Sequence, residues 1–172
     1  MYILGDIGNT ETKIWLVSKN NKIIKKINFS TKEITNNKLS IILKKNNFKF
    51  KYIEKILFCS VVPQTFNLIK KFLSKKINRK CYEVKSLNLK SLIKVKVDYK
   101  QIGSDRITNA ISLMNGKNNY ILLDFGTATT FDVLVQNTYY AGIIAPGVKL
   151  SLNSLSDKAT LIPKINLKKI TK

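Results

Sequence analysis

Short alternating runs of apolar and polar residues open the chain and predict β-strands. Three strands are expected in the first thirty positions, over residues 2–7, 12–18 and 22–29, with turns at Gly8-Asn9-Thr10 and Asn20-Asn21. The apolar run "IEKILFCSVVP" predicts a buried strand that ends at Pro63. The last third of the chain returns to the same pattern, with strands expected over residues 119–125, 128–136 and 138–144.

Helices are expected where apolar residues recur at spacings of three and four. After Pro63, one helical face carries Phe66, Ile69, Leu73 and Ile77. A second helix is expected from an N-cap at Ser104 to Gly116, with a buried face formed by Ile107, Ala110, Ile111 and Met114. Ser30-Thr31 and Pro146-Gly147 offer two further helix starts, and the last helix is expected to run to about Asp157. Short strands or loops are expected over residues 80–102. Because strands and helices alternate, the expected class is α/β.

Two stretches of the chain match each other without gaps. They are "LGDIGNTETKIWLV" from Leu4 and "LLDFGTATTFDVLV" from Leu122, and the overlay pairs Asp6 with Asp124, Gly8 with Gly126 and Thr12 with Thr130. In each copy an aspartate ends a strand, and a turn with glycine and threonine precedes a returning strand. Such a hairpin can hold phosphate, because glycine permits close approach while N–H groups and hydroxyls donate to phosphate oxygens. One copy alone is more simply a β-hairpin. Two copies predict two related halves that each present one loop to a nucleotide between them.

Composition excludes several kinds of site. The 172-residue chain contains no histidine, so a general base must be a carboxylate or a lysine, and His-ligated zinc is excluded. Its two cysteines, Cys59 and Cys81, are far apart and fit neither a disulfide framework nor a metal-binding spacing. Cys59 lies in an apolar run and is expected to be a small core residue.

The net charge of +21 raises the question of nucleic-acid binding. The excess is almost wholly lysine, since Arg79 and Arg106 are the only arginines, and the lysines are spread along the whole chain. Base-reading sites favour the planar arginine fork, so we expect a solvated lysine surface with non-specific attraction to polyanions and no specific nucleic-acid partner. No apolar run approaches the roughly 20 residues needed to span a bilayer, and no signal-peptide pattern is present. A cytoplasmic protein without a membrane partner is expected.

Four motifs occur in order along the chain: "DIGNTETK", "GSDRITNA", "DFGTATTFD" and "GIIAPGVKLSLNSLSDKATLIP". Together they resemble the type III pantothenate kinase family, which belongs to the actin and sugar-kinase superfamily with its ribonuclease H-like core. The resemblance covers nearly the whole chain. It implies an α/β, two-lobed ribonuclease H-like fold, in which residues 1–116 form the first lobe and residues 117–172 begin a second lobe. Only 56 residues follow Gly116, so the second lobe is expected to be truncated.

The resemblance also implies an ATP site. The first loop would contact ATP through Asp6, Ile7, Gly8, Asn9, Thr10, Glu11, Thr12 and Lys13, and the second loop through Thr127. Asp6 suits the water shell of Mg²⁺. Lys13 would bring positive charge to the transferred phosphate, unless it is an ordinary edge-strand lysine. Asp124 resembles the family's ligand for a monovalent cation, K⁺ or NH₄⁺.

Asp105 resembles the family's catalytic base, which accepts the hydroxyl proton of pantothenate. From the residues alone, an aspartate in the first turn of a helix is better explained by its favourable interaction with the helix dipole. The implied substrate-binding residues are Tyr99, Gly103, Ser104, Asp105 and Arg106. Arg106 is expected to bind the substrate carboxylate, with a structural salt bridge as the alternative. Asp132, the only acid on its strand, is interpreted as structural.

The implied function is ATP-dependent phosphorylation of pantothenate to 4'-phosphopantothenate, the first step of coenzyme A biosynthesis, by a homodimer. Two alternatives stay open. The same family includes proteins described as accessory transcription activators, so the basic chain could bind DNA. The truncated chain could also be a catalytically inactive remnant.

Overall fold

The first sheet contains five strands in the order β3-β2-β1-β4-β5. The computed structural model describes residues 1–48 and 50–159. Strands β1 (Tyr2–Ile7), β2 (Glu11–Val17) and β3 (Ile23–Ser30) form an antiparallel meander. Strands β4 (Lys55–Ser60) and β5 (Cys81–Glu83) continue the sheet in parallel with β1.

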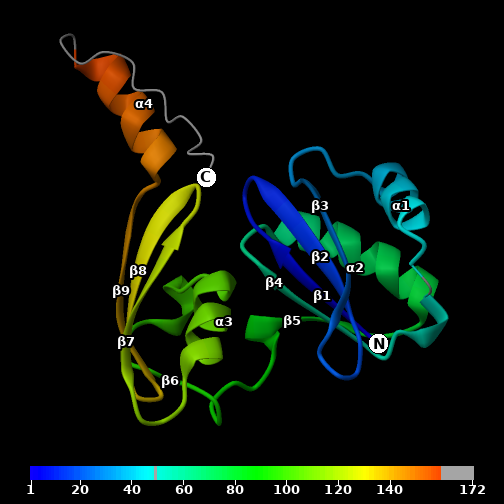
Figure 1. Ribbon diagram of the computed structural model, residues 1–172, viewed down its shortest axis with the longest axis horizontal. Helices are drawn as coiled ribbons and strands as arrows, with labels where there is room; N and C mark the ends of the chain where they lie inside the picture. Colours follow the sequence, from blue (N-terminus) through cyan, green and yellow to red (C-terminus); the bar gives the residue numbers. More distant parts are fainter. Residues whose placement is uncertain (49, 160–172) are drawn as a thin grey trace.

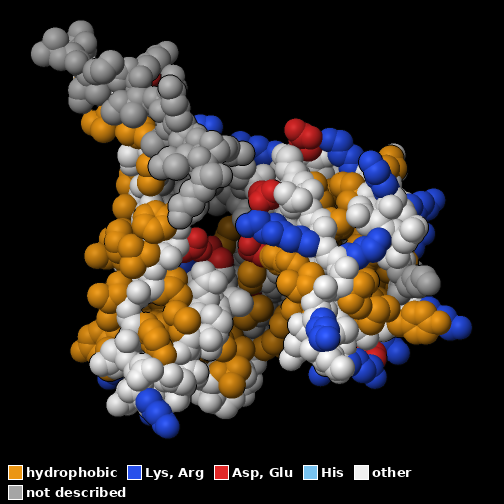
Figure 2. Space-filling model, viewed as in Figure 1, with side chains coloured by type: hydrophobic (Ala, Val, Ile, Leu, Met, Phe, Trp, Pro, Cys, Tyr) orange, Lys and Arg blue, Asp and Glu red, His pale blue; other side chains and the backbone are white. Residues whose placement is uncertain are grey.

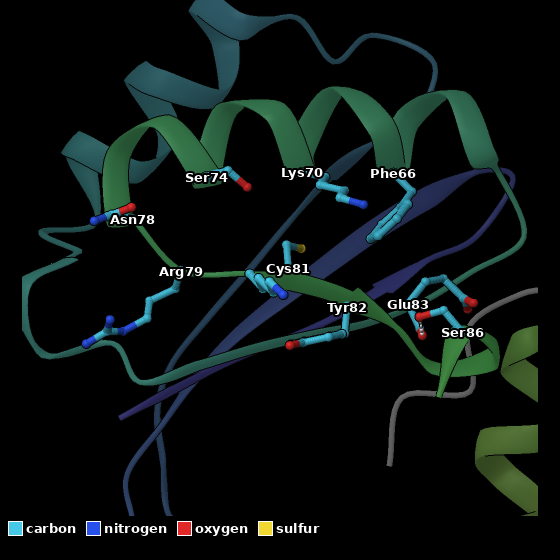
Figure 3. Close-up of a pocket in the computed structure, with 10 residues that line it drawn as sticks. Phe66, Lys70, Ser74, Asn78, Arg79, Cys81, Tyr82, Glu83 and Ser86 are labelled. Carbon is cyan, nitrogen blue, oxygen red and sulfur yellow. Dashed lines mark hydrogen bonds between the residues drawn. The ribbon is translucent and has the colours of Figure 1, made fainter. Parts of the chain in front are cut away.

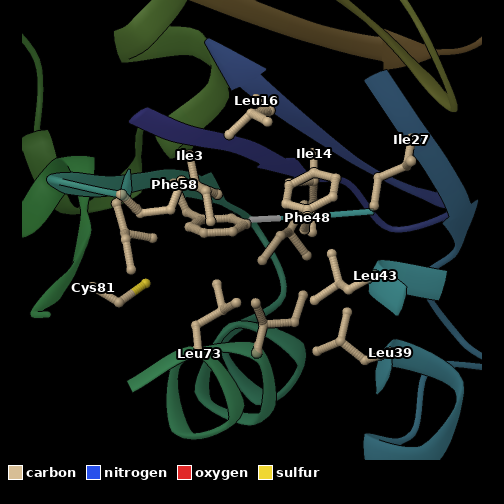
Figure 4. Packing of buried hydrophobic residues seen from close by; sticks show 14 of the residues in the cluster. Ile3, Ile14, Leu16, Ile27, Leu39, Leu43, Phe48, Phe58, Leu73 and Cys81 are labelled. Atoms are coloured by element: carbon tan, nitrogen blue, oxygen red, sulfur yellow. The ribbon is translucent and has the colours of Figure 1, made fainter. Parts of the chain in front are cut away.

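Helices α1 (Asn36–Lys45) and α2 (Pro63–Ile77) cover one face of this sheet (Figure 1). Because side chains alternate along a strand, Ile3 and Ile7 of β1 point into the same core as Ile56 and Phe58 of β4. Figure 4 shows this core, in which Leu39, Leu43 and Leu73 of the two helices approach the sheet. The predicted helix after Pro63 is confirmed. Helix α1 begins later than expected, because Ser30 ends β3 and Thr35 is the N-cap, accepting from the N–H of Lys38 at 3.2 Å.

The second sheet has the order β6-β9-β8-β7. It is built from β6 (Lys94–Val95), β7 (Asn119–Phe125), β8 (Ala128–Val135) and β9 (Thr138–Pro146), and helix α4 (Val148–Lys158) follows β9. The three long strands confirm the predicted ones to within two residues. Short 3-10 turns cover Phe50–Tyr52 (η1), Val84–Ser86 (η2) and Tyr99–Gln101 (η3).

Helix α3 (Ser104–Leu113) lies between the two sheets (Figure 1). Its Ile107 and Ala110 pack with Leu134 and Tyr139 of the second sheet, and Leu57 and Cys59 of β4 pack against the same cluster. The N-cap is Gly103 and not the predicted Ser104, and the helix ends at Leu113, before Gly116. Strand β6 pairs with β9, and α3 packs on the second sheet, although both precede residue 117. The boundary between residues 116 and 117 stays a prediction.

The two hairpins share their strand pairing but differ by one residue in the turn. Ile7 pairs with Thr12 across the first hairpin, whereas Phe125 pairs with Thr129 across the second. The counterpart of Thr12 is therefore Thr129, and the ungapped pairing of Thr12 with Thr130 is wrong after the turn. Both Thr12 and Thr129 are buried, which supports the corrected register.

The second sheet exposes an apolar face. Ile121 and Phe125 of β7 and Ile143 of β9 are 69%, 67% and 67% exposed. In Figure 2, apolar side chains gather along the left edge of the molecule, on the side of the second sheet. By register, Ile121 and Phe125 correspond to Ile3 and Ile7, which α1 and α2 cover in the first sheet. In residues 1–48 and 50–159, no helix is both long and apolar enough to cross a membrane.

Candidate active site between the two loops

The two predicted loops meet in space. The hydroxyls of Thr10, between β1 and β2, and Thr127, between β7 and β8, are hydrogen bonded at 2.9 Å although 117 positions separate them in sequence. This contact confirms the expectation that the two hairpins face each other. A polyphosphate placed at this junction would have backbone N–H groups and hydroxyls on two sides.

Thr31 holds the first loop in shape. Its hydroxyl donates to the carbonyl of Gly8 at 2.8 Å, and its N–H donates to the carbonyl of Thr10 at 3.0 Å. The Thr12 and Thr31 hydroxyls lie 2.9 Å apart, and the N–H of Gly8 closes the turn on the carbonyl of Glu11 at 3.0 Å. The sequence pattern offered Thr31 only as a helix start, because its contacts with the first loop are made across a strand pair.

The eight residues of the first loop divide into supporting and accessible groups. Ile7 and Thr12 are fully buried, so only their backbone can face a nucleotide. Asn9 and Thr10 are exposed at the tip of the turn, and Asp6 is half-buried at the end of β1. The chemistry of the loop therefore depends on Asp6, Asn9, Thr10 and the backbone N–H groups.

Lys13 lies directly across the β1–β2 ladder from Asp6, which puts the two side chains on the same face of the sheet. Its Nζ is 3.7 Å from Oε2 of Glu11, and Asn28 donates to Glu11 at 2.6 Å. The Asn28 hydrogen bond and the Lys13 charge lower the pKa of Glu11, which keeps this exposed acid ionised. Lys13 is 38% exposed, so its ammonium group is accessible from the loop.

Asp105 lies in the first turn of α3, beside both loops. Burial raises the pKa of its carboxyl group, the neighbouring charges of Asp6 and Asp124 raise it further, and the N–H of Arg106 opposes them by donating at 2.8 Å. Three carboxyl groups from three separate elements therefore lie near one another. A raised pKa suits a general base, since it strengthens proton acceptance near neutral pH.

Asp124 is the penultimate residue of β7 and accepts from the side-chain amide of Asn109 at 3.2 Å. Thr130 faces it across the β7–β8 ladder, and among the described residues the buried Thr130 hydroxyl has no hydrogen-bond partner. A carboxylate beside a hydroxyl offers the hard oxygen ligands that a monovalent cation prefers. The donor set therefore fits the cation that the sequence motif implies.

Cys59 is partly buried and packs against the second core cluster, in agreement with the expected core position, and its thiol also faces the site. Its thiol donates to Oδ1 of Asp6 at 3.5 Å. Burial, with the charge of Asp6, raises the pKa of this thiol to about 12. Cys59 is therefore a neutral donor that orients Asp6.

The residues of the predicted substrate motif differ in burial and in their contacts. Ser104 is buried and donates its hydroxyl to Glu83, so it ties α3 to β5. Arg106 is also buried and forms an ion pair with Asp132, which favours the structural alternative for this arginine. The Tyr99 ring lies 4.9 Å from the Lys85 ammonium group and lines a cavity of 650 Å³.

Within the described residues, no group of three or more Asp, Glu or Cys side chains is arranged to hold a metal ion alone. Mg²⁺ in kinases is commonly bound by one or two carboxylates together with phosphate oxygens and water. Asp6 can supply such a carboxylate, so the residues present fit this mode of binding.

A cavity of 660 Å³ lies apart from the two loops, between α2 and β5 (Figure 3). Phe66 and Lys70 of α2 and Cys81 and Tyr82 of β5 line it. None of the predicted site residues contributes to its wall.

Comparison with known proteins identifies the family. The family model described as type III pantothenate kinase matches residues 2–172. The type III pantothenate kinase of Pelagibacter ubique is 62% identical over 169 residues, which cover 98% of this chain and 68% of the relative. That of a Sulfurihydrogenibium species is 37% identical over 181 residues, with 98% and 69% coverage. The chain thus spans about two thirds of the length of these relatives.

Two solved structures share the fold. A conserved putative Baf family transcriptional activator from Campylobacter jejuni superposes with a TM-score of 0.53 at 20% identity, covering 99% of this chain and 68% of that one. A putative 2-dehydro-3-deoxygalactonokinase from Sinorhizobium meliloti gives 0.53 at 8% identity, with 94% and 58% coverage. These similarities confirm the α/β, ribonuclease H-like fold. The match to the family model and the identity with its curated members show that this chain belongs to the type III pantothenate kinase family.

Proposed function

We propose that this chain transfers the γ-phosphoryl group of ATP to the hydroxyl of pantothenate, giving 4'-phosphopantothenate and ADP. The hydrogen bond between Thr10 and Thr127 carries the proposal, because it brings together two loops that are 117 positions apart in sequence and that are each suited to bind phosphate. Asp105 beside them supplies a carboxylate where an attacking hydroxyl would lie. Family membership supports the choice of pantothenate as acceptor.

Positioning and charge account for most of the catalysis in phosphoryl transfer. The exposed tip residues Asn9 and Thr10 and the loop backbone donate to the phosphate oxygens, Thr127 contacts them from the second loop, and Lys13 adds positive charge. Asp6 holds Mg²⁺, which when bound offsets the phosphate charge. These residues orient ATP with its γ-phosphoryl group toward α3.

Asp105 accepts the proton of the pantothenate hydroxyl. As that proton moves to the carboxylate, the hydroxyl oxygen bonds to the γ-phosphorus and the bond to the β–γ bridging oxygen breaks, releasing ADP. General-base assistance of this kind contributes roughly 10²–10⁴-fold in rate. Tyr99 and Gly103 form part of the acceptor side of the site, and Ser104 and Arg106 support it from behind.

Three further features follow from the family resemblance. Asp124 would hold K⁺ or NH₄⁺, and the Thr130 hydroxyl, its partner across the ladder, could supply a second oxygen. The active protein is a homodimer and works in the cytoplasm. Light scattering of the purified chain measures the oligomeric state, and a purely monomeric active protein contradicts the dimer.

Coupled measurement of ADP release tests the function. We expect pantothenate-dependent turnover that rises with added potassium and falls 10²-fold or more in Asp105→Asn. Glu33→Gln is a matched control, because Glu33 is an exposed acid paired with Lys38 at 2.9 Å, away from the site. If the wild-type rate equals that of Asp105→Asn, the chain is a catalytically inactive remnant and the proposal is refuted.

A further inference from the structure

A buried polar cluster joins α3 to the second sheet. Nε and Nη2 of Arg106 donate to Oδ1 of Asp132 at 2.8 and 2.5 Å, and the hydroxyl of Tyr139 donates to the same oxygen. The Arg106 and Asp132 side chains are only 8% and 0% exposed. One carboxylate oxygen thus receives three donors from two elements, α3 and β9.

The cluster leaves no room for a side chain at position 142. Gly142 lies opposite Asp132 in the β8–β9 ladder. A Cβ atom at Gly142 would approach Oδ1 of Asp132 to 2.7 Å and would collide with Nη2 of Arg106 and the hydroxyl of Tyr139. The absence of a side chain at position 142 therefore leaves the space that the Arg106 guanidinium group occupies against the sheet.

Contacts on both sides fix the rotation of α3 about its axis. On the side of the second sheet, Arg106 is held by Asp132, and Asn109, one turn further along, donates to Asp124. On the side of the first sheet, Ser104 donates to Glu83 of β5. Because Asp105 lies between Ser104 and Arg106, these contacts determine where its carboxylate points.

A buried ion pair is a weak source of stability, since the cost of removing both charges from water offsets their attraction. Leu134, a neighbour of Asp132 on the same face of β8, is apolar and fully buried. Apolar residues of similar volume could replace the ion pair if stability were its only purpose. Unlike an apolar contact, the ion pair is directional, and it attaches one particular residue of α3, Arg106, to the sheet.

We propose that Asp132, assisted by Tyr139, is a positioning residue that acts through Arg106 to orient α3 and to hold the Asp105 carboxylate between the two phosphate-binding loops. The catalytic consequence rests on the proposed function, whereas the orientation of α3 does not. Hydrogen exchange tests the orientation of α3, and steady-state kinetics test its catalytic consequence.

Hydrogen exchange measures the attachment without any catalysis. In Asp132→Asn and in the milder Tyr139→Phe, we expect amides of residues 104–113 to exchange at least tenfold faster, while those of α2 stay unchanged. Asp157→Asn, an exposed acid on α4, is the matched control. Unchanged exchange in α3 of a folded Tyr139→Phe or Asp132→Asn protein overturns the proposal.

Steady-state kinetics then test the link to Asp105. We expect kcat to fall at least tenfold in Asp132→Asn with the KM for ATP unchanged, because the ATP loops stay in place. In an Arg106→Gln background the same substitution should have little additional effect, since Asp132 acts through Arg106. Additive losses, or a rise in the KM for ATP alone, overturn the positioning role. Absence of turnover in the wild-type chain refutes the proposed function instead, and the exchange result still decides the attachment.

Discussion

Replacing Gly147 by alanine should displace the second loop. Gly147 precedes α4, and its N–H donates to the carbonyl of Thr127 at 3.1 Å. A Cβ atom at this position would lie 2.5 Å from the carbonyl oxygen of Thr127 and would also collide with that of Gly126. Both obstacles are backbone atoms, so no side-chain rotation can relieve the contact.

The size of the effect follows from these distances. Real Cβ contacts essentially never fall below 3.0 Å, so the Thr127 carbonyl, now at 2.5 Å, must move by at least about 0.5 Å. Overpacking of this kind typically costs about 1–3 kcal/mol in the free energy of unfolding. The same displacement breaks the alignment of Thr127 with Thr10, and because a 1 Å misplacement can cost roughly 10²-fold in rate, a loss of about tenfold in kcat is expected.

Urea denaturation and the ADP-release assay measure the two quantities. Gly126→Ala is the matched control for stability, because its Cβ atom would meet only the carbonyl of Ala128, at an ordinary 3.5 Å. The reasoning is refuted if Gly147→Ala unfolds at the same urea concentration as the wild type, or if Gly126→Ala is the more destabilised of the two.

Three further predictions concern titration, thiols and charge. Burial and the charges of Asp6 and Asp124 raise the pKa of Asp105 in the folded protein. At pH values above its usual pKa of 3.8, the ionised carboxylate therefore destabilises the fold. Asp105→Asn should therefore increase the free energy of unfolding at pH 7 but not near pH 3, and denaturation at the two pH values checks this. Burial raises the pKa of both Cys59 and Cys81 to about 12, so a thiol reagent at pH 8 should label them only after unfolding, and rapid labelling of the native protein would contradict this. With a net charge of +21, DNA affinity should fall steeply with salt and show no sequence preference; sequence-specific binding at physiological salt would favour the transcription-activator alternative.

Local pattern was sufficient for most of the fold. Strands β1 and β2 and helix α2 follow from alternation and from three-and-four spacing, because burial of one face imposes its period on the sequence. The loops were found because each needs glycine and small hydroxyl residues in a short turn. Helix α1 was misplaced at Ser30-Thr31, since a hydroxyl residue that ends a strand has the same local appearance as one that caps a helix.

The sequence by itself determined the two loops, the class of the fold, the family and the identity of Asp105 as the acid beside a helix start. It also pointed to Asp132, as a single acid on an otherwise apolar strand, without naming its partner. The tertiary structure decided the rest: the shorter second turn, the support of the first loop by Thr31, and the pairing of Arg106 with Asp132 across 26 positions. These contacts join residues distant in the chain, and their energies depend on how α3 packs between two sheets, which no local pattern of apolar and polar residues encodes.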